Sequence, residues 1–241
     1  MKFLLFFLPG LFLYTNSFTQ NIHKDSTTDF QEDNVISLYN RYTDGNAPVY
    51  NGSEYLNYTS KLEGDPFFGS DNNSNGWISY EGTRYSRLSI LYDITRDQVV
   101  ILFPDSNSRV VLHNEFIDSF YLEGHTFIRL QEDQQQNLAN TGFYDLLFDG
   151  KVRLFARRVK TIEDVIKSNA AGKVFYSSNH YYLFRSGLYY LIDNKKDEFR
   201  FIGDKSHQIK LLMRQAHLKF HRRNFESTLV NVTELYDQII R

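Results

Sequence analysis

The pattern of apolar and polar positions predicts two kinds of structure in succession. Between residues 77 and 130, short runs rich in β-branched and aromatic residues alternate with turn-forming residues at intervals of about 8 to 12 positions, which is typical of antiparallel strands. In residues 193–241 the apolar residues recur at spacings of three and four, as on one face of a helix. The predicted strands are 77–80, 85–92, 98–103, 109–112, 117–122 and 126–130.

Strand signals resume after a polar loop at residues 131–141. Asp149-Gly150 separates two apolar runs, and this dipeptide suits the type I′ turn of a tight hairpin. We therefore predict an α+β fold, in which a mainly antiparallel meander, sandwich or curved sheet is followed by a C-terminal helical cap. The expected elements are strands at 143–148 and 152–157, a short helix at 161–171 capped by Thr161, a hairpin of 173–176 with 180–185, and a strand at 188–192.

Three helices are expected in the last fifty residues. Asp193 or Asn194 can cap the first, which ends before Gly203, and Asp204 or Ser206 can cap the second. A third helix follows Asn224 as its cap. The apolar stripe of the second helix is Ile209, Leu212, Met213, Ala216 and Phe220, and that of the third is Phe225, Leu229, Val232, Tyr236 and Ile239.

The N-terminus has the layout of a secretory signal peptide. Lys2 precedes an apolar run at residues 3–14, which is shorter than the roughly 20 residues of a transmembrane helix. We expect export to the periplasm, the outer membrane or the exterior, and no transmembrane segment. The expected organisation is a signal peptide at 1–20, a flexible tail at 21–34 and one β-rich domain at 35–241, made of a wrapping segment at 35–75 with a helical turn at 36–42, the sheet at 76–192 and the helices at 193–241.

The composition excludes several chemistries. The chain has no cysteine, so thiol catalysis, iron–sulfur clusters and cysteine-ligated zinc are excluded. Its 21 Phe and 17 Tyr must supply the core that disulfides stabilise in many exported proteins. The formal net charge is −2, but residues 205–223 contain six Lys and Arg and no acid.

Several longer stretches resemble a group of exported proteins of Bacteroidota. They are YNGSEY at 50–55, DPFF at 65–68, FYDLLFDGKVRLFARRVK at 143–160, YYLFRSGLYYLIDNKKDEFRFIGDK at 181–205 and LVNVTELYDQII at 229–240. The resemblance covers most of the chain after the signal peptide. It implies export in a Gram-negative cell, and it implies no activity and no catalytic residue.

No catalytic motif is assembled in the sequence. His217 and His221 lie four apart, but residue 218 is Leu, so the HExxH metalloprotease motif is absent and we expect no metal. There is no G-x-S-x-G elbow and no phosphate-binding loop, so no cofactor is expected. Two carboxylate pairs leave a polysaccharide-acting enzyme open as an alternative. These pairs are Glu115 with Asp118 and Asp145 with Asp149.

Two groups of residues are candidates for binding. An aromatic group could form a platform for a glycan or peptide, although the Asn51-Gly52 turn favours rings that fold back and seal the sheet. A basic group could contact an anion, although a solvated helix face is the commoner meaning of such a run. The aromatic group is Tyr50, Tyr55, Tyr58, Phe67 and Phe68, and the basic group is Lys210, Arg214, Lys219, Arg222 and Arg223.

Together these patterns predict an exported envelope protein with a binding or structural role and without catalysis. Its partner could be an envelope protein or a glycan, and no nucleic acid is expected. The alternatives are a carboxylate-dependent enzyme acting on polysaccharide, and a lipid or assembly carrier of the cell envelope.

Overall fold

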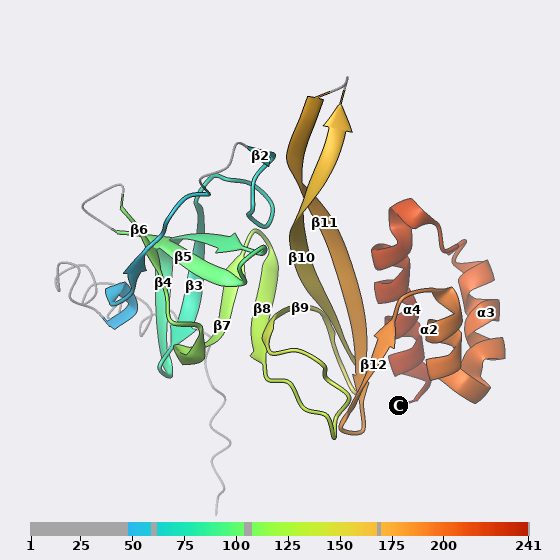
Figure 1. Cartoon of the computed structure of the whole chain (residues 1–241). Helices are drawn as coiled ribbons and strands as arrows, with labels where there is room; N and C mark the ends of the chain where they lie inside the picture. The colour runs from blue at the N-terminus through green and yellow to red at the C-terminus, as the bar shows by residue number, and fades with distance from the viewer. Residues whose placement is uncertain (1–47, 59–61, 104–107, 168–169, 241) are drawn as a thin grey trace, which may run out of the picture.

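A computed structural model describes residues 48–58, 62–103, 108–167 and 170–240. Its centre is one 12-stranded sheet in which almost all neighbouring strands are antiparallel, followed by helices (Figure 1). The predicted α+β class is therefore confirmed. The predicted signal peptide, flexible tail and helical turn at 36–42 lie outside the described residues, as does the first part of the wrapping segment.

The first part of the sheet has the strand order β1-β6-β5-β4-β3-β7-β8. Each predicted strand between residues 77 and 130 is present, with ends that shift by up to three residues. The tight turns contain residues with positive φ, such as Glu123 at 51° and Gly124 at 87°. The strands are β1 (Ser53–Glu54), β3 (Ser74–Tyr80), β4 (Thr83–Asp93), β5 (Gln98–Leu102), β6 (Arg109–Val111), β7 (Ile117–Leu122) and β8 (His125–Leu130), with the 3-10 turns η1 (Pro48–Tyr50) and η2 (Asn114–Phe116) beside them.

An aromatic core fills this part of the sheet. Tyr92, Phe120, Phe127 and Phe143 are almost completely buried. The ring of Phe120 stacks on that of Phe127 with centroids 4.8 Å apart, and it meets Phe143 edge-on at 5.1 Å. Such rings supply large buried areas, so this region is stabilised by packing without disulfides.

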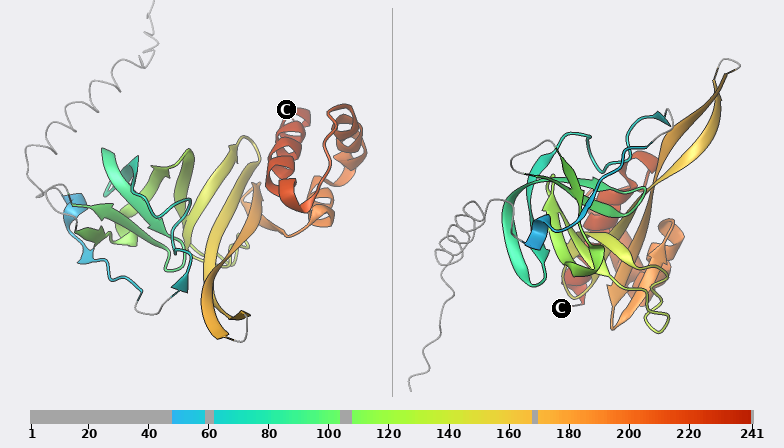
Figure 2. Two further views of the ribbon diagram at one scale, coloured as in Figure 1. Left: turned by 90° about the horizontal axis from the view of Figure 1, so that it is seen from above. Right: turned by 60° about the vertical axis from the view of Figure 1, so that its left-hand side comes forward.

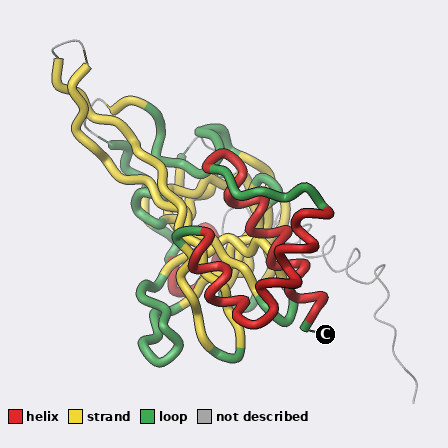
Figure 3. The backbone as a smooth tube through the Cα atoms, turned by 90° about the vertical axis from the view of Figure 1, so that its right-hand side faces the viewer, coloured by secondary structure: helices red, strands yellow, loops and turns green. Residues whose placement is uncertain are grey.

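The second part of the sheet carries the helices on one face. Val152, just before β10, and Leu154 and Ala156 within it point toward the helices, whereas Phe155 points to the opposite face. Figures 2 and 3 show the helices gathered as a cap beside these strands. The elements are β9 (Gly142–Asp149), β10 (Arg153–Lys167), β11 (Ala170–Arg185), β12 (Leu188–Ile192), β2 (Leu62–Glu63), α2 (Lys195–Ile202), η3 (Gly203–Lys205), α3 (Ser206–Gln215), η4 (Arg222–Asn224) and α4 (Phe225–Ile239).

The predicted short helix at 161–171 is wrong. The strand β10 continues through Thr161 to Lys167, and β11 pairs with it in one unbroken register from Lys167↔Ala170 to Arg153↔Phe184. The predicted hairpin of 173–176 with 180–185 is wrong for the same reason, because residues 177–179 remain in the strand. Thr161, Ile162, Val165 and Ile166 are β-branched, and their cross-strand pairing outweighs the helical spacing.

The outer half of this hairpin projects from the body of the protein. We call residues 161–167 and 170–178 the arm (Figures 1 and 2). β9 pairs with β10 only at residues 153–156, and β12 pairs with β11 only at residues 181–185. The arm is therefore a two-stranded ribbon, to which β2 adds parallel pairing at Lys173 and Val174.

The helix ends decide the shape of the cap. The Asn194 side chain accepts a hydrogen bond from Lys196 N and caps α2 as predicted. The predicted caps of α3 are wrong, because Lys205 holds that position and makes no side-chain capping bond. α3 also ends at Gln215, so Ala216 and Phe220 of the predicted stripe lie beyond the helix. α4 begins after Asn224 as predicted.

Candidate functional site: a basic pocket in the helical cap

A pocket of about 460 Å³ lies between α2, α3 and the segment that follows α3. This volume falls in the range of small-molecule sites, about 300 to 1,000 Å³. None of its lining residues is acidic. The cationic residues are Lys195, Lys210, Arg214 and Lys219, the histidines are His217 and His221, and the apolar residues are Phe199, Met213, Leu218 and Phe220.

The end of α3 creates the pocket. His217 has a φ of 54°, a left-handed conformation that costs a residue other than glycine about 1 kcal/mol. Leu218 N donates to Met213 O at 2.8 Å, which closes the last turn of α3 and reverses the chain. The reversal brings residues 217–221 alongside Lys210 and Arg214. Without it the helix would continue, and these side chains would not surround a common space.

Two ammonium groups share one aromatic ring inside the pocket. Lys210 Nζ lies 4.8 Å from the ring centroid of Phe199, and Lys195 Nζ lies 5.7 Å from the same centroid. Each contact is a cation–π interaction. Phe199 thus keeps two positive charges at the pocket, and an anion bound there would be attracted by both.

The structure gathers part of the predicted basic group. Lys210, Arg214 and Lys219 line the pocket, whereas Arg222 and Arg223 lie in η4 and do not line it. The sequence did not identify Lys195 and Phe199, which come from α2. No local pattern in the sequence points to them, because their place in the pocket depends on how α2 packs beside α3 and on the chain reversal at His217.

Most residues of the predicted aromatic group pack against other residues of the fold. Tyr55 and Phe67 are buried, and the Tyr55 hydroxyl donates to Asp93 Oδ2 at 2.9 Å. The Tyr58 hydroxyl donates to the same carboxylate at 3.1 Å, and burial together with the Asp93 charge raises the pKa of Tyr58 to about 12. Tyr50 packs edge-on against Phe103, and Phe68 packs against His125 and Phe127. The structure thus brings three of the five residues together around Asp93.

Neither predicted carboxylate pair faces a common space. Asp145 is buried and accepts hydrogen bonds from Arg158 Nε at 3.0 Å and from His125 Nδ1 at 2.8 Å. This hydrogen bond to Asp145 raises the pKa of His125 despite partial burial. Asp149 is exposed at the end of β9. For the other pair, Glu115 lies 3.7 Å from His113 and Asp118 accepts from Ser79 Oγ at 3.1 Å.

The acid next to His125 belongs to a larger buried network. The guanidinium of Arg158 also binds the Glu226 carboxylate of α4, and the Tyr181 hydroxyl donates to Glu226 Oε2 at 2.9 Å. The carboxylates of Asp145 and Glu226 therefore share one buried cation. This network attaches the start of α4 to the sheet, which is a structural role.

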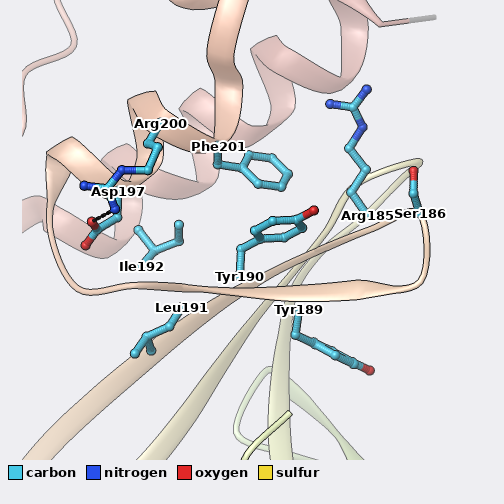
Figure 4. A pocket seen from close by; sticks show the side chains of 9 residues that line it. All are labelled: Arg185, Ser186, Tyr189, Tyr190, Leu191, Ile192, Asp197, Arg200 and Phe201. Carbon is cyan, nitrogen blue, oxygen red and sulfur yellow. Dashed lines mark hydrogen bonds and ion pairs between the residues drawn. The ribbon is translucent and has the colours of Figure 1, made fainter. Parts of the chain in front are cut away.

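A second pocket, of about 500 Å³, lies between β12 and α2 (Figure 4). Tyr190 and Phe201 face each other across it with ring centroids 5.0 Å apart, while Tyr189 points to the other side of the strand. Its charged groups are already paired: Arg200 binds Asp197 at 3.1 Å, and Arg185 binds the Tyr236 hydroxyl. The basic pocket is therefore the better candidate for a charged ligand.

Comparison with protein-family models, with curated proteins and with solved structures found no match to this chain. Among the residues that the structure describes, no group of three or more His, Asp or Glu could hold a metal ion. Within the same residues, no helix is long and apolar enough to cross a membrane.

Proposed function

We propose that the protein binds a small anionic ligand in the basic pocket of its helical cap. The observation that supports this most is the composition of the pocket, which combines four Lys and Arg residues with an apolar wall and contains no acid. Positive charges in one concave space raise the local concentration of anions. A solvated helix face, the alternative meaning of the basic run, would not be lined by residues of three separate segments.

The two kinds of lining residue define the chemical class of the ligand. Arg214 offers a planar fork of donors that suits a phosphate or carboxylate, and the lysines add mobile point charges. Phe199, Phe220 and Met213 offer apolar surface on which a hydrocarbon or aromatic group can pack. The ligand that fits both is an amphiphilic anion, with a phosphate or carboxylate joined to an apolar body.

We place this binding in the cell envelope. The apolar run at residues 3–14 and the resemblance to exported Bacteroidota proteins support export. An anionic amphiphile in that compartment is consistent with a carrier or binding role. The alternative of an enzyme acting on polysaccharide has less support, because Asp145 is held by Arg158 and His125.

Calorimetric titration with octyl phosphate tests the proposal, with octyl glucoside as an uncharged amphiphile and inorganic phosphate as a bare anion. We expect octyl phosphate to bind more tightly than either of the others. Arg214→Gln should weaken its binding about tenfold or more, since a hydrogen bond to a charged group contributes about 1.5 to 3 kcal/mol.

Arg222→Gln is the matched control, because it removes the same charge from the same basic run outside the pocket. Its affinity for octyl phosphate should equal that of the unchanged protein. Equal losses in both variants would indicate general charge attraction and would contradict a site. Absence of binding to all three probes would also contradict the proposal.

A further inference from the structure

Along the arm, the outer edge of β10 has no partner strand within the part of the chain that the structure describes. Lys160 N donates to Ile94 O at 3.3 Å, and beyond this bond no described strand pairs with that edge. Two-stranded ribbons are marginally stable in water, and a free edge is a template for another strand. We infer that two copies of this chain pair through this edge and form an antiparallel, two-fold symmetric dimer.

The direction of the Lys160 amide fixes which groups are available. It points away from β11, and backbone groups alternate along a strand, so the N–H and C=O groups of Ile162, Asp164 and Ile166 also point outward. In an antiparallel pair, residues with outward groups must stand opposite one another. A two-fold axis that places two different residues of this set opposite one another can therefore pass through residue 163, 164 or 165.

The side chains distinguish these three registers. An axis at residue 163 would place Ile162 opposite Asp164 of the second copy, and an axis at residue 165 would place Asp164 opposite Ile166. Each of these two joins an apolar residue to a charge. An axis at residue 164 places Ile162 opposite Ile166 of the second copy, twice by symmetry. Apolar β-branched pairs stabilise sheets, so the axis at residue 164 is favoured.

A small pocket beside Ile162 supports the same register. It has a volume of about 300 Å³, and its apolar residues are Leu56, Leu62 and Ile162. Leu56 is 69% exposed and Ile166 is 84% exposed, so both present apolar surface to the solvent. Ile166 of the second copy, opposite Ile162, would cover this pocket, and each copy would bury the exposed residues of the other.

The shape of the molecule allows this pairing. The arm projects from the body (Figures 1 and 2). In an antiparallel pair, the two bodies lie at opposite ends of the joined arms. The pairing would join the β10 and β11 strands of both copies into one four-stranded sheet, which exceeds the three strands needed for a sheet to be stable on its own.

A pair of like charges destabilises the dimer in this register. The two Asp164 carboxylates meet at the axis, each with Lys173 of its own β11 at 3.8 Å. Like charges directly opposite one another destabilise strand pairing. Asp164→Asn should therefore tighten the dimer about 2- to 5-fold.

Sedimentation of the full chain over a series of concentrations tests the inference. We expect a concentration-dependent dimer that Ile166→Lys abolishes. Tyr176→Lys is the matched control, because Tyr176 is also exposed on the arm, at 50%, but belongs to β11 and projects from the other face. A monomer at every concentration would overturn the inference, and so would a dimer insensitive to Ile166→Lys.

Single cysteines test the register, since the chain has none of its own. Asp164→Cys places two thiols at the axis, about 5.5 Å apart between Cα atoms, within the range for a disulfide. Mild oxidation should link this variant to itself. Glu163→Cys lies opposite Val165 of the second copy and should link far less. Equal linking of both would contradict the register, and the result is independent of the anion pocket.

Discussion

The aromatic core around β3 to β8 and the helical cap are stabilised in different ways. Around Phe120 and Phe127 the buried groups are mostly rings and aliphatic side chains, and the buried Asp93 at the end of β4 accepts a hydrogen bond from the Tyr55 hydroxyl. The cap buries further ionisable groups, including Glu198 in α2 and Asp237 in α4. Asp237 accepts a hydrogen bond from Val152 N at 3.0 Å, whereas neither Glu198 oxygen has a partner among the described residues.

This difference indicates where the molecule can accommodate a ligand. A core of packed rings tolerates little change in volume. The cap packs on the sheet through an apolar cluster of its own, but it also buries Glu198 without a partner among the described residues, and it contains the basic pocket. Regions that bind ligands are commonly drawn from the less stable parts of a fold. The aromatic core is therefore the expected centre of stability, and the cap carries the proposed binding site.

Phe120→Ala tests the first half of the comparison and should have the largest effect. Phe120 is completely buried and contacts Tyr92, Phe127 and Phe143. We expect a loss of about 3 to 5 kcal/mol in the free energy of unfolding, measured with denaturant. Leu211→Ala is the control, since Leu211 is 44% exposed on α3 and should lose less than 1 kcal/mol. Equal losses would contradict the comparison.

Glu198→Gln tests the buried carboxyl of the cap. Burial raises the pKa of Glu198 from 4.5 to about 8. The folded protein therefore keeps a proton that the unfolded chain loses, so stability falls as the pH rises from about 4.5 to 8. Because glutamine has no proton to lose, the variant should be more stable by about 3 kcal/mol at pH 7 and nearly equal at pH 4. If the variant and the parent had the same stability at both pH values, the raised pKa of Glu198 would be contradicted.

Glu226→Gln tests the contact between Glu226 and Arg158 that attaches α4 to the sheet. It should change the free energy of unfolding less than the two preceding substitutions. Burial opposes the charge, but the bonds from Arg158 and Tyr181 outweigh it and lower the pKa of Glu226. Its contribution is therefore present above about pH 4.5 and is lost as the pH falls through the lowered pKa. We expect the variant to lose about 1 to 2 kcal/mol of unfolding free energy at pH 7 and less near pH 3.

The control for Glu226→Gln is Glu234→Gln, which makes the same change at an exposed position of the same helix. Denaturant unfolding of both variants at each pH compares them directly. A Glu234 variant as unstable as the Glu226 variant would show that the net charge of α4 matters and that the Arg158 contact does not.

Much of the fold could be predicted because its signals are local. Alternation and turn residues located the strands between residues 77 and 130, and the spacing of Leu229, Val232 and Tyr236 located α4. The arm could not be predicted, because TIEDVIKSNAA has apolar residues at both helical and strand spacings. What decides between them is the pairing of Ile162 with Phe175 and its neighbours, which is a tertiary contact.

The site could be predicted only in part, for a similar reason. The basic run predicted Lys210, Arg214 and Lys219, because their charge can be read from the sequence. The contribution of Lys195 depends on how α2 packs beside α3, and that of His221 depends on the reversal at His217. Likewise, no local pattern shows that Arg158 reaches both Asp145 and Glu226, which lies 68 positions away.

The strand order has a consequence for folding kinetics. From β7 to β12 each strand lies next to the one before it in the chain, and from β3 to β6 the same holds in the other direction. These hairpins can form early, because closing a short loop costs little entropy. β2 instead pairs with β11 and joins Leu62 to Lys173, which lie far apart in the chain. This pairing should form late, and it should be the first to open in local unfolding of the native protein.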